Sequence, residues 1–192
     1  MDGTDIPIEE PCHPINPKWY VHKLNRAAVR YKLAIGIHTG WIVWINGLFP
    51  AGQYSDVTIV RQSLIHFLNK NKKYIADGAY RDGDQWSLTP IGTHTYRDRQ
   101  MTLIWSRHKT INARLKEWYI LLDRFWHPLS KHSLVFWLVA NIVQLGLETD
   151  RPAFQIHYDK IEFRSIKNLK GDVIFHYLWM NNWVVAGHHF LV

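Results

Sequence analysis

Cysteine is nearly absent from this sequence of 192 residues, in which Cys12 is the only one. A single thiol excludes an intrachain disulfide framework and offers no thiolate pair for a structural zinc ion. Three glycine-containing signatures are missing as well: the Gly-x-Gly-x-x-Gly fingerprint, the phosphate-binding loop and the Gly-x-Ser-x-Gly elbow. Without them, the sequence gives no support to dinucleotide binding, P-loop chemistry or serine-hydrolase chemistry.

Long apolar runs are also scarce. The N-terminal segment is acidic and lacks an apolar run, so we expect no signal peptide. The apolar segment at residues 134–147 is shorter than the ~20 residues needed to cross a bilayer. Residues 173–192 contain no Lys, Arg, Asp or Glu, but their asparagines and histidines would be costly in hydrocarbon. We therefore expect no membrane-spanning segment, and interpret residues 173–192 as an extra strand or a loosely attached extension.

The composition is that of a folded, basic protein. Apolar residues make up 47% of the chain and charged residues 20%, which argues against intrinsic disorder. The chain is long enough for one domain with a substantial core. Lys and Arg outnumber Asp and Glu by 23 to 16, a formal net charge of +7. This excess favours a polyanionic partner such as nucleic acid or an acidic membrane surface.

Apolar periodicity predicts an α/β domain. Residues 31–37 alternate in character and residues 41–45 are apolar throughout, which predicts a hairpin of one half-buried and one central strand. Ser55 or Asp56 can cap a following helix, and a second helix is predicted to begin near Arg107. The other predicted elements are an extended start at 1–18 with a short strand at 4–8, a strand at 74–77, a loop-rich insert at 81–100 and a buried helix at 134–147. Their order predicts a mixed sheet flanked by helices.

Three acidic positions are candidates for chemistry. Asp77 ends a short apolar strand, where α/β sheets place functional groups, although an Asp before Gly78 is also typical of a turn. Asp56 opens a helix and can equally be an N-cap. Asp2 and Asp5 lie three residues apart, so on a strand only one of them can face a given site.

Taken in order, several motifs resemble the DDE-superfamily endonuclease domain of Harbinger-type transposases. The resemblance covers roughly residues 1–148. It is carried by Asp2-Gly3-Thr4, Pro17-Lys18-Trp19-Tyr20, Arg30-Tyr31, Ile42-Val43-Trp44-Ile45-Asn46-Gly47, Asp56, Ala76-Asp77-Gly78-Ala79-Tyr80-Arg81, the run from Arg107 to Lys116 (RHKTINARLK), His132 and Asn141.

This resemblance implies an RNase H-like mixed sheet flanked by helices, and divalent-metal-dependent cleavage and transfer of DNA strands. Two Mg²⁺ or Mn²⁺ ions need hard oxygen ligands from separate elements, and the ions in turn offset the repulsion between clustered carboxylates. By the resemblance, Asp2 matches the first catalytic Asp and Asp77 a later one, while Asp56 matches a further metal ligand. DNA is the implied partner, the nucleus the implied location, and a homo-oligomer is compatible with the family.

The sequence departs from the family at one catalytic position. The last carboxylate of the family is a Glu in a run like Arg-His-Glu-Thr, where this chain has Lys109. An ammonium there repels both ions instead of binding them. Glu117 does not substitute easily, because eight residues along a helix is roughly 12 Å. We therefore predict weak or no strand cleavage, which leaves enzyme activity open.

A basic stripe follows the same motif. Between Arg107 and His132 there are six Lys or Arg residues and two acids. Such a stripe can bind phosphates, although an ordinary solvated helix face would have the same pattern. The candidate nucleic-acid-binding residues are Arg107, Lys109, Arg114, Lys116 and Arg124.

The tryptophans are mostly expected in the core. Their strand or helix positions favour packing for Trp41, Trp44, Trp118 and Trp137. Trp86 and Trp105, in or beside the loop-rich insert, are the better candidates for stacking on bases.

The chain is thus predicted to have a DDE endonuclease-like domain at 1–148 and a C-terminal extension at 149–192. A second interpretation is a catalytically inactive, domesticated nucleic-acid-binding protein. A third is a basic α/β interaction domain with no nucleic-acid role.

Overall fold

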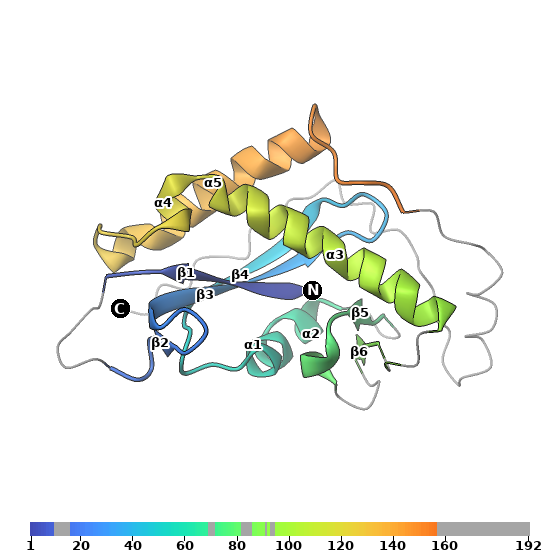
Figure 1. Ribbon diagram of the computed structural model, residues 1–192, viewed down its shortest axis with the longest axis horizontal. Helices are drawn as coiled ribbons and strands as arrows, with labels where there is room; N and C mark the ends of the chain where they lie inside the picture. The colour runs from blue at the N-terminus through green and yellow to red at the C-terminus, as the bar shows by residue number, and fades with distance from the viewer. Residues whose placement is uncertain (10–15, 69–71, 82–85, 91, 93–94, 157–192) are drawn as a thin grey trace.

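The computed structural model of the chain describes residues 1–9, 16–68, 72–81, 86–90, 92 and 95–156. Over these ranges the protein is a mixed α/β structure, with helices on both faces of its sheet (Figure 1). This confirms the predicted α/β class.

The main sheet is antiparallel and is built around its longest strand. Strand β3 (Arg26–Ile35) pairs on one side with β1 (Asp2–Pro7), with Asp2 opposite Leu33 and Gly3 opposite Lys32. It also pairs with β4 (Ile42–Pro50) and with the short β2 (Tyr20–Val21). The predicted hairpin is therefore present as β3 and β4, and both strands are longer than predicted.

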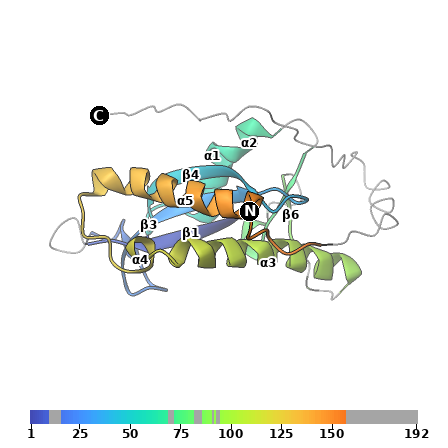
Figure 2. The ribbon, with the colours of Figure 1, turned by 90° about the horizontal axis from the view of Figure 1, so that it is seen from above.

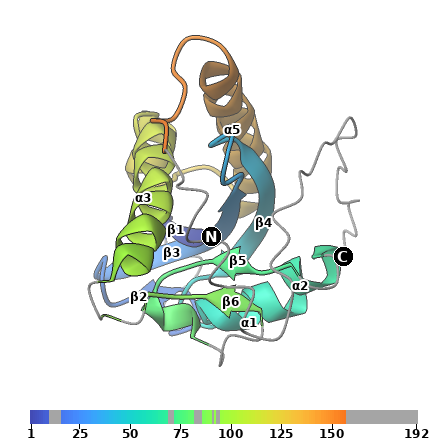
Figure 3. The ribbon, with the colours of Figure 1, turned by 90° about the vertical axis from the view of Figure 1, so that its right-hand side faces the viewer.

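A second, parallel pair of strands lies beside the start of β1. It consists of β5 (Tyr74–Ile75) and β6 (Ser87–Leu88). The backbone nitrogen of Met1 donates to the carbonyl of Ile75 at 2.8 Å, which joins β5 to the beginning of β1 (Figure 3). Asp2, which follows Met1, and the residues that follow β5 therefore lie at the same edge of the structure.

Two long helices cover one face of the main sheet. Helices α3 (Tyr96–Lys116) and α5 (His132–Glu148) lie side by side over it (Figure 2), linked by α4 (Tyr119–Leu122) and the 3-10 turn η2 (Leu129–Lys131). The largest core cluster is buried here, where residues of β1 and β3 meet both helices. Its fully buried members include Tyr31, Leu33, Ile111, Leu115 and Phe136.

The opposite face carries the shorter helices α1 (Asp56–Gln62) and α2 (Leu64–Phe67) and the 3-10 turn η1 (Gly78–Tyr80). A smaller core cluster, including Val60, Ala76 and Tyr80, is buried on this side. Lys32, at the middle of β3, is therefore covered by helical structure and is fully buried.

The start of α3 differs from the prediction. Residues 96–106 were expected in a loop-rich insert and at the start of a helix near Arg107, but the helix begins eleven residues earlier, at Tyr96. Thr95 supplies the missing start signal, because its side chain accepts a hydrogen bond from the backbone nitrogen of Asp98 at 3.2 Å. Such an N-cap satisfies one of the free donors of the first helical turn.

Helix α5 is less buried than predicted. One side packs into the core through residues such as Phe136 and Val139, but Leu134, Leu138 and Leu145 are each more than 60% exposed. Trp41, Trp118 and Trp137 were also predicted in the core, and each is about 40% exposed. The prediction failed because apolar character shows only that a side chain can be buried. Whether it is buried depends on how many neighbouring elements pack against it.

The packed structure continues past residue 148, where the sequence suggested a boundary. Ala153 is buried in the main core cluster, and the carbonyl of Phe154 accepts hydrogen bonds from Arg107 on α3. The interpretation of residues 173–192 lies outside the described residues. Across the part of the chain that the structure describes, no helix is both long and apolar enough to cross a membrane.

His132 makes the stability of this core dependent on pH. Its Nδ1 lies 2.9 Å from the hydroxyl of Tyr31, its Nε2 is buried without a partner, and burial lowers its pKa from 6.5 to about 4. The unfolded chain binds a proton at this imidazole more readily than the folded protein does. The folding stability that is present above pH 6.5 is therefore lost as the pH falls through about 4. The loss amounts to about 3 kcal/mol at most.

The prediction is checked by thermal unfolding of the wild type and His132→Phe across this pH window. The wild-type Tm should fall more steeply with acid than that of the variant, which keeps an aromatic ring beside Tyr31 and Phe125. Equal slopes would contradict the assignment.

Candidate active site

Asp2 and Asp77 lie near the place where β1 begins and β5 ends. Asp2 is the first residue of β1, and Asp77 comes two residues after the last residue of β5. Because the Met1–Ile75 hydrogen bond joins these strands, the two carboxylates lie in one electrostatic neighbourhood, in which Asp77 raises the pKa of Asp2. Mg²⁺ is commonly bound through one or two carboxylates, with water and substrate phosphates as its other ligands.

The surroundings of Asp2 are partly apolar and partly polar. Burial is the largest influence and raises the pKa of Asp2, while the Gly3 N–H, Lys32 and the Met1 amine lower it to a smaller extent. The Gly3 N–H donates to Oδ1 at 2.8 Å, and Asn112 on α3 donates its amide to Oδ2 at 3.4 Å. Asp2 is thus oriented by its own strand and by the helix above it.

His108 lies one helical turn before Asn112 and faces the same site. Its Nε2 is 2.7 Å from the Met1 nitrogen, and its Nδ1 is buried with no hydrogen-bond partner. Burial, the Met1 amine and Lys32 hold the pKa of His108 well below its usual value, which keeps the ring neutral. In the sequence, His108 and Asn112 stand out only as parts of a motif; their spacing of four residues is the signal that they share a helix face.

Asp77 also has the turn role that its sequence context indicated. Its Oδ1 accepts a hydrogen bond from the Ala79 nitrogen at 3.0 Å and caps the turn η1. The two interpretations of Asp77 are therefore compatible, since one oxygen caps the turn while the carboxylate remains close to Asp2.

Asp56 is not brought into the same group of side chains. Successive strand residues point to opposite faces of a sheet, and Asp2 faces α3 whereas Lys32, opposite Gly3, faces α1. On the α1 side, Asp56 Oδ1 lies 2.5 Å from the Lys32 Nζ and 3.1 Å from an Arg30 nitrogen. The expected metal ligand Asp56 is instead the anion of a salt-bridge network, and the N-cap of α1 is Ser55.

The position of the missing Glu is next to His108 in the sequence of α3. Lys109 is exposed on α3, next in sequence to the buried His108, and its ammonium lies 4.7 Å from the ring centre of Trp105. Glu117, at the end of α3, forms a two-pronged ion pair with Arg151, with distances of 3.0 and 3.1 Å. In this ion pair the Glu117 carboxylate binds the segment that follows α5.

Arg107 has to be removed from the predicted phosphate-binding set. It is only 2% exposed, and its guanidinium donates to the carbonyls of Phe154 and Ile37. Arg114, on the same side of α3, donates to the carbonyls of Arg151 and Pro152. These arginines hold the chain that follows α5 against α3, a role that the charge pattern did not reveal.

The other three candidate nucleic-acid-binding residues lie at or near the surface. Lys109 is exposed, and Lys116 is half-buried, with burial lowering its pKa. Arg124 is exposed, pairs with Glu9 at 3.0 Å and lies 4.9 Å from the ring centre of Trp126. An arginine beside an exposed indole can contact both a phosphate and a base.

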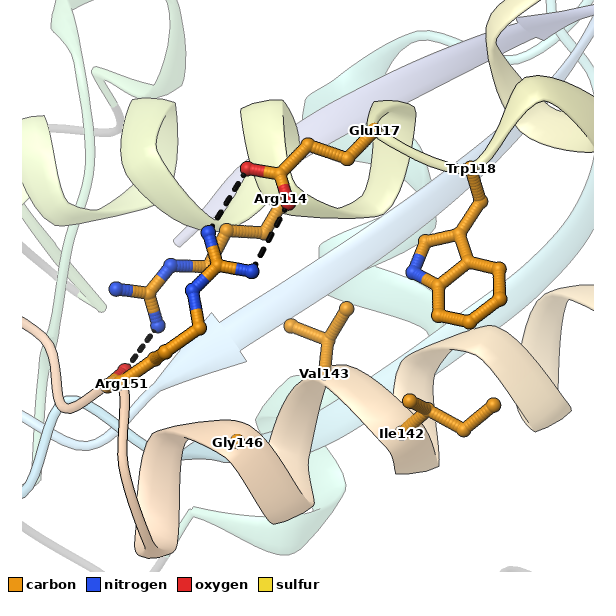
Figure 4. A pocket seen from close by; sticks show the side chains of 7 residues that line it. All are labelled: Arg114, Glu117, Trp118, Ile142, Val143, Gly146 and Arg151. Carbon is orange, nitrogen blue, oxygen red and sulfur yellow. Dashed lines mark hydrogen bonds and ion pairs between the residues drawn. The ribbon is translucent and has the colours of Figure 1, made fainter.

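A small pocket lies between the end of α3 and α5 (Figure 4). It is lined by Arg114, Glu117, Trp118, Ile142, Val143, Gly146 and Arg151. Neither Asp2 nor Asp77 borders it, so it is separate from the carboxylate site.

The carboxylates fit a divalent ion in part. Asp2 and Asp77 supply the oxygen ligands that Mg²⁺ and Mn²⁺ prefer, but Asp56 is paired with two cations. Among the residues that the structure describes, no three His, Cys, Asp or Glu side chains are grouped to hold one metal ion. Comparisons with protein-family models, with curated proteins and with solved structures find no match for this chain.

Proposed function

We propose that this chain is a DDE-type nuclease domain of transposase origin that binds DNA and whose strand cleavage is impaired. The observation that supports the proposal most is the meeting of Asp2 and Asp77 at neighbouring strand ends, beneath His108 and Asn112 of α3. These residues come from the segments that resemble the Harbinger-type family, although they are far apart in the sequence. An antiparallel sheet flanked by helices on both faces, with a separate parallel pair of strands beside it, is compatible with an RNase H-like fold.

The chemistry of the proposed site rests on Asp2 and Asp77, which would hold Mg²⁺ or Mn²⁺. Such an ion polarises a phosphodiester and lowers the pKa of bound water. The Asn112 amide orients Asp2, and the neutral ring of His108 adds no positive charge beside it. Lys109 places a cation where the family has its last carboxylate, which is the reason that cleavage is expected to be weak.

A catalytically inactive, domesticated DNA-binding protein is the second candidate. It is favoured by Lys109 and by the pairing of Asp56 with Lys32 and Arg30, which leaves one expected ligand engaged elsewhere. Both candidates have DNA as partner and the nucleus as location, and they differ only in whether any cleavage remains.

DNA binding is tested by its dependence on salt. We expect the observed association constant for duplex DNA to fall steeply with salt, because each phosphate contact contributes about −0.9 to the logarithmic slope. Replacing both Lys109 and Arg124 by glutamine should make the slope shallower by roughly two.

Arg61→Gln is a matched control, because Arg61 is exposed on α1, across the sheet from α3. Each single Gln substitution removes one positive charge, and only those on the α3 side should change the slope. A flat salt response of the wild type would contradict the proposed DNA partner.

A further inference from the structure

Lys32 is completely buried, although nothing in the sequence pattern marks this lysine as unusual. Its ammonium lies 2.5 Å from Asp56 Oδ1 and also donates to the Tyr80 hydroxyl. The side chain crosses over Gly3 of β1, where even one methyl group would clash with the ammonium. Glycine at that position therefore makes room for the buried cation.

The ammonium is placed among more than one carboxylate. Besides its salt bridge to Asp56, Lys32 lowers the pKa of the neighbouring Asp2. Its other partner, Tyr80, has its pKa raised by burial and by the negative charges of Asp56, Asp2 and Asp77. The hydroxyl that accepts from Lys32 therefore responds to the charges of all three acids, whereas the ammonium itself pairs with Asp56 alone.

A buried ammonium and a divalent ion favour the same surroundings. Clustered carboxylates repel one another and need positive charge nearby, which either cation supplies. A site that already holds an ammonium attracts a second cation less, because the two cations repel each other across a medium of low dielectric constant.

We propose that Lys32, an internal counter-ion that pairs with Asp56 and packs against Gly3, disfavours divalent metal ions at the neighbouring Asp2 and Asp77. The inference takes Asp2 and Asp77 from the proposed function, but it concerns metal affinity and not cleavage. It gives the site a second obstacle besides Lys109.

The test measures Mn²⁺ binding to the full chain by electron paramagnetic resonance, without DNA. We expect weak binding by the wild type and binding about tenfold tighter or more in Lys32→Met, because one buried positive charge beside the ion has been removed. Arg30→Gln is the matched control. Arg30 also pairs with Asp56 and its loss changes the net charge equally, but Arg30 is not among the charges that shift the pKa of Asp2. Lys32→Arg, which keeps the charge, should keep the weak binding.

Several outcomes would overturn the proposal. One is tight Mn²⁺ binding by the wild type that is lost in Asp77→Asn, which is informative even if Lys32→Met fails to fold. Another is an equal gain in Arg30→Gln, which would make the effect one of net charge only. A folded Lys32→Met with unchanged affinity would also refute it. The salt-dependent DNA binding described above fails or succeeds independently of these results, so the two proposals are separable.

Discussion

Asp56→Ala is expected to lower the free energy of unfolding by about 3 kcal/mol, because it breaks a salt bridge whose cation is buried. Lys32 has no exposed surface, and Asp56 is its carboxylate partner at 2.5 Å. Removing the carboxylate leaves the ammonium with Tyr80 alone, while Arg30 keeps its other partner, Asp5. The cost is thus that of an uncompensated buried charge and not that of a lost surface contact.

Denaturant unfolding of the variant and a control measures this cost. Glu117→Ala breaks the Arg151 ion pair, whose two side chains are each about half exposed, and it should be much less destabilising than Asp56→Ala because solvent screens the pair. If Asp56→Ala were no more destabilising than Glu117→Ala, the burial of Lys32 and its dependence on Asp56 would both be wrong.

The Lys109→Glu variant is expected to cleave DNA at least about tenfold faster than the wild type in excess Mn²⁺. The substitution replaces a repelling ammonium with a carboxylate on α3, close in sequence to His108 and Asn112, which face Asp2. Lys109 is exposed, so the exchange of side chains should leave the fold unchanged.

Nicking of supercoiled plasmid is the measurement, and two further variants separate the causes. Lys109→Gln removes the positive charge without adding a ligand and should gain less than Lys109→Glu. Asp77→Asn in the Lys109→Glu background should abolish the gain. Robust cutting by the wild type, equal to that of Lys109→Glu, would show that Lys109 is not a defect.

The predictable parts of this fold are those determined by local sequence. The alternation at 31–37 and the apolar run at 41–45 identified the β3–β4 hairpin, because burial of one strand face imposes a period of two. The short apolar run predicted as a strand at 74–77 identified β5, which is two residues long and buried at both. The early start of α3 was missed because its N-cap, Thr95, follows a segment rich in Gly and Pro.

The parts that could not be predicted depend on contacts between distant segments. Lys32 occupies a polar position in an alternating strand, which indicates an exposed side chain unless another element covers it. Asp56, 24 residues later, supplies both the cover and the charge that makes burial tolerable. Likewise, the burial of Arg107 depends on the carbonyl of Phe154, 47 residues away. Charge and spacing alone therefore placed Asp56 at the metal site and Arg107 on the surface.

The central claim is that Asp2 and Asp77 form one site for a divalent ion beneath α3. It is tested most directly by a crystal structure of Lys109→Glu soaked in Mn²⁺, with anomalous scattering used to locate the ion. We predict a manganese peak held by Asp2 and Asp77 that disappears when Asp77 is replaced by asparagine. Manganese bound only elsewhere, or the two carboxylates on opposite faces of the sheet, would contradict the account.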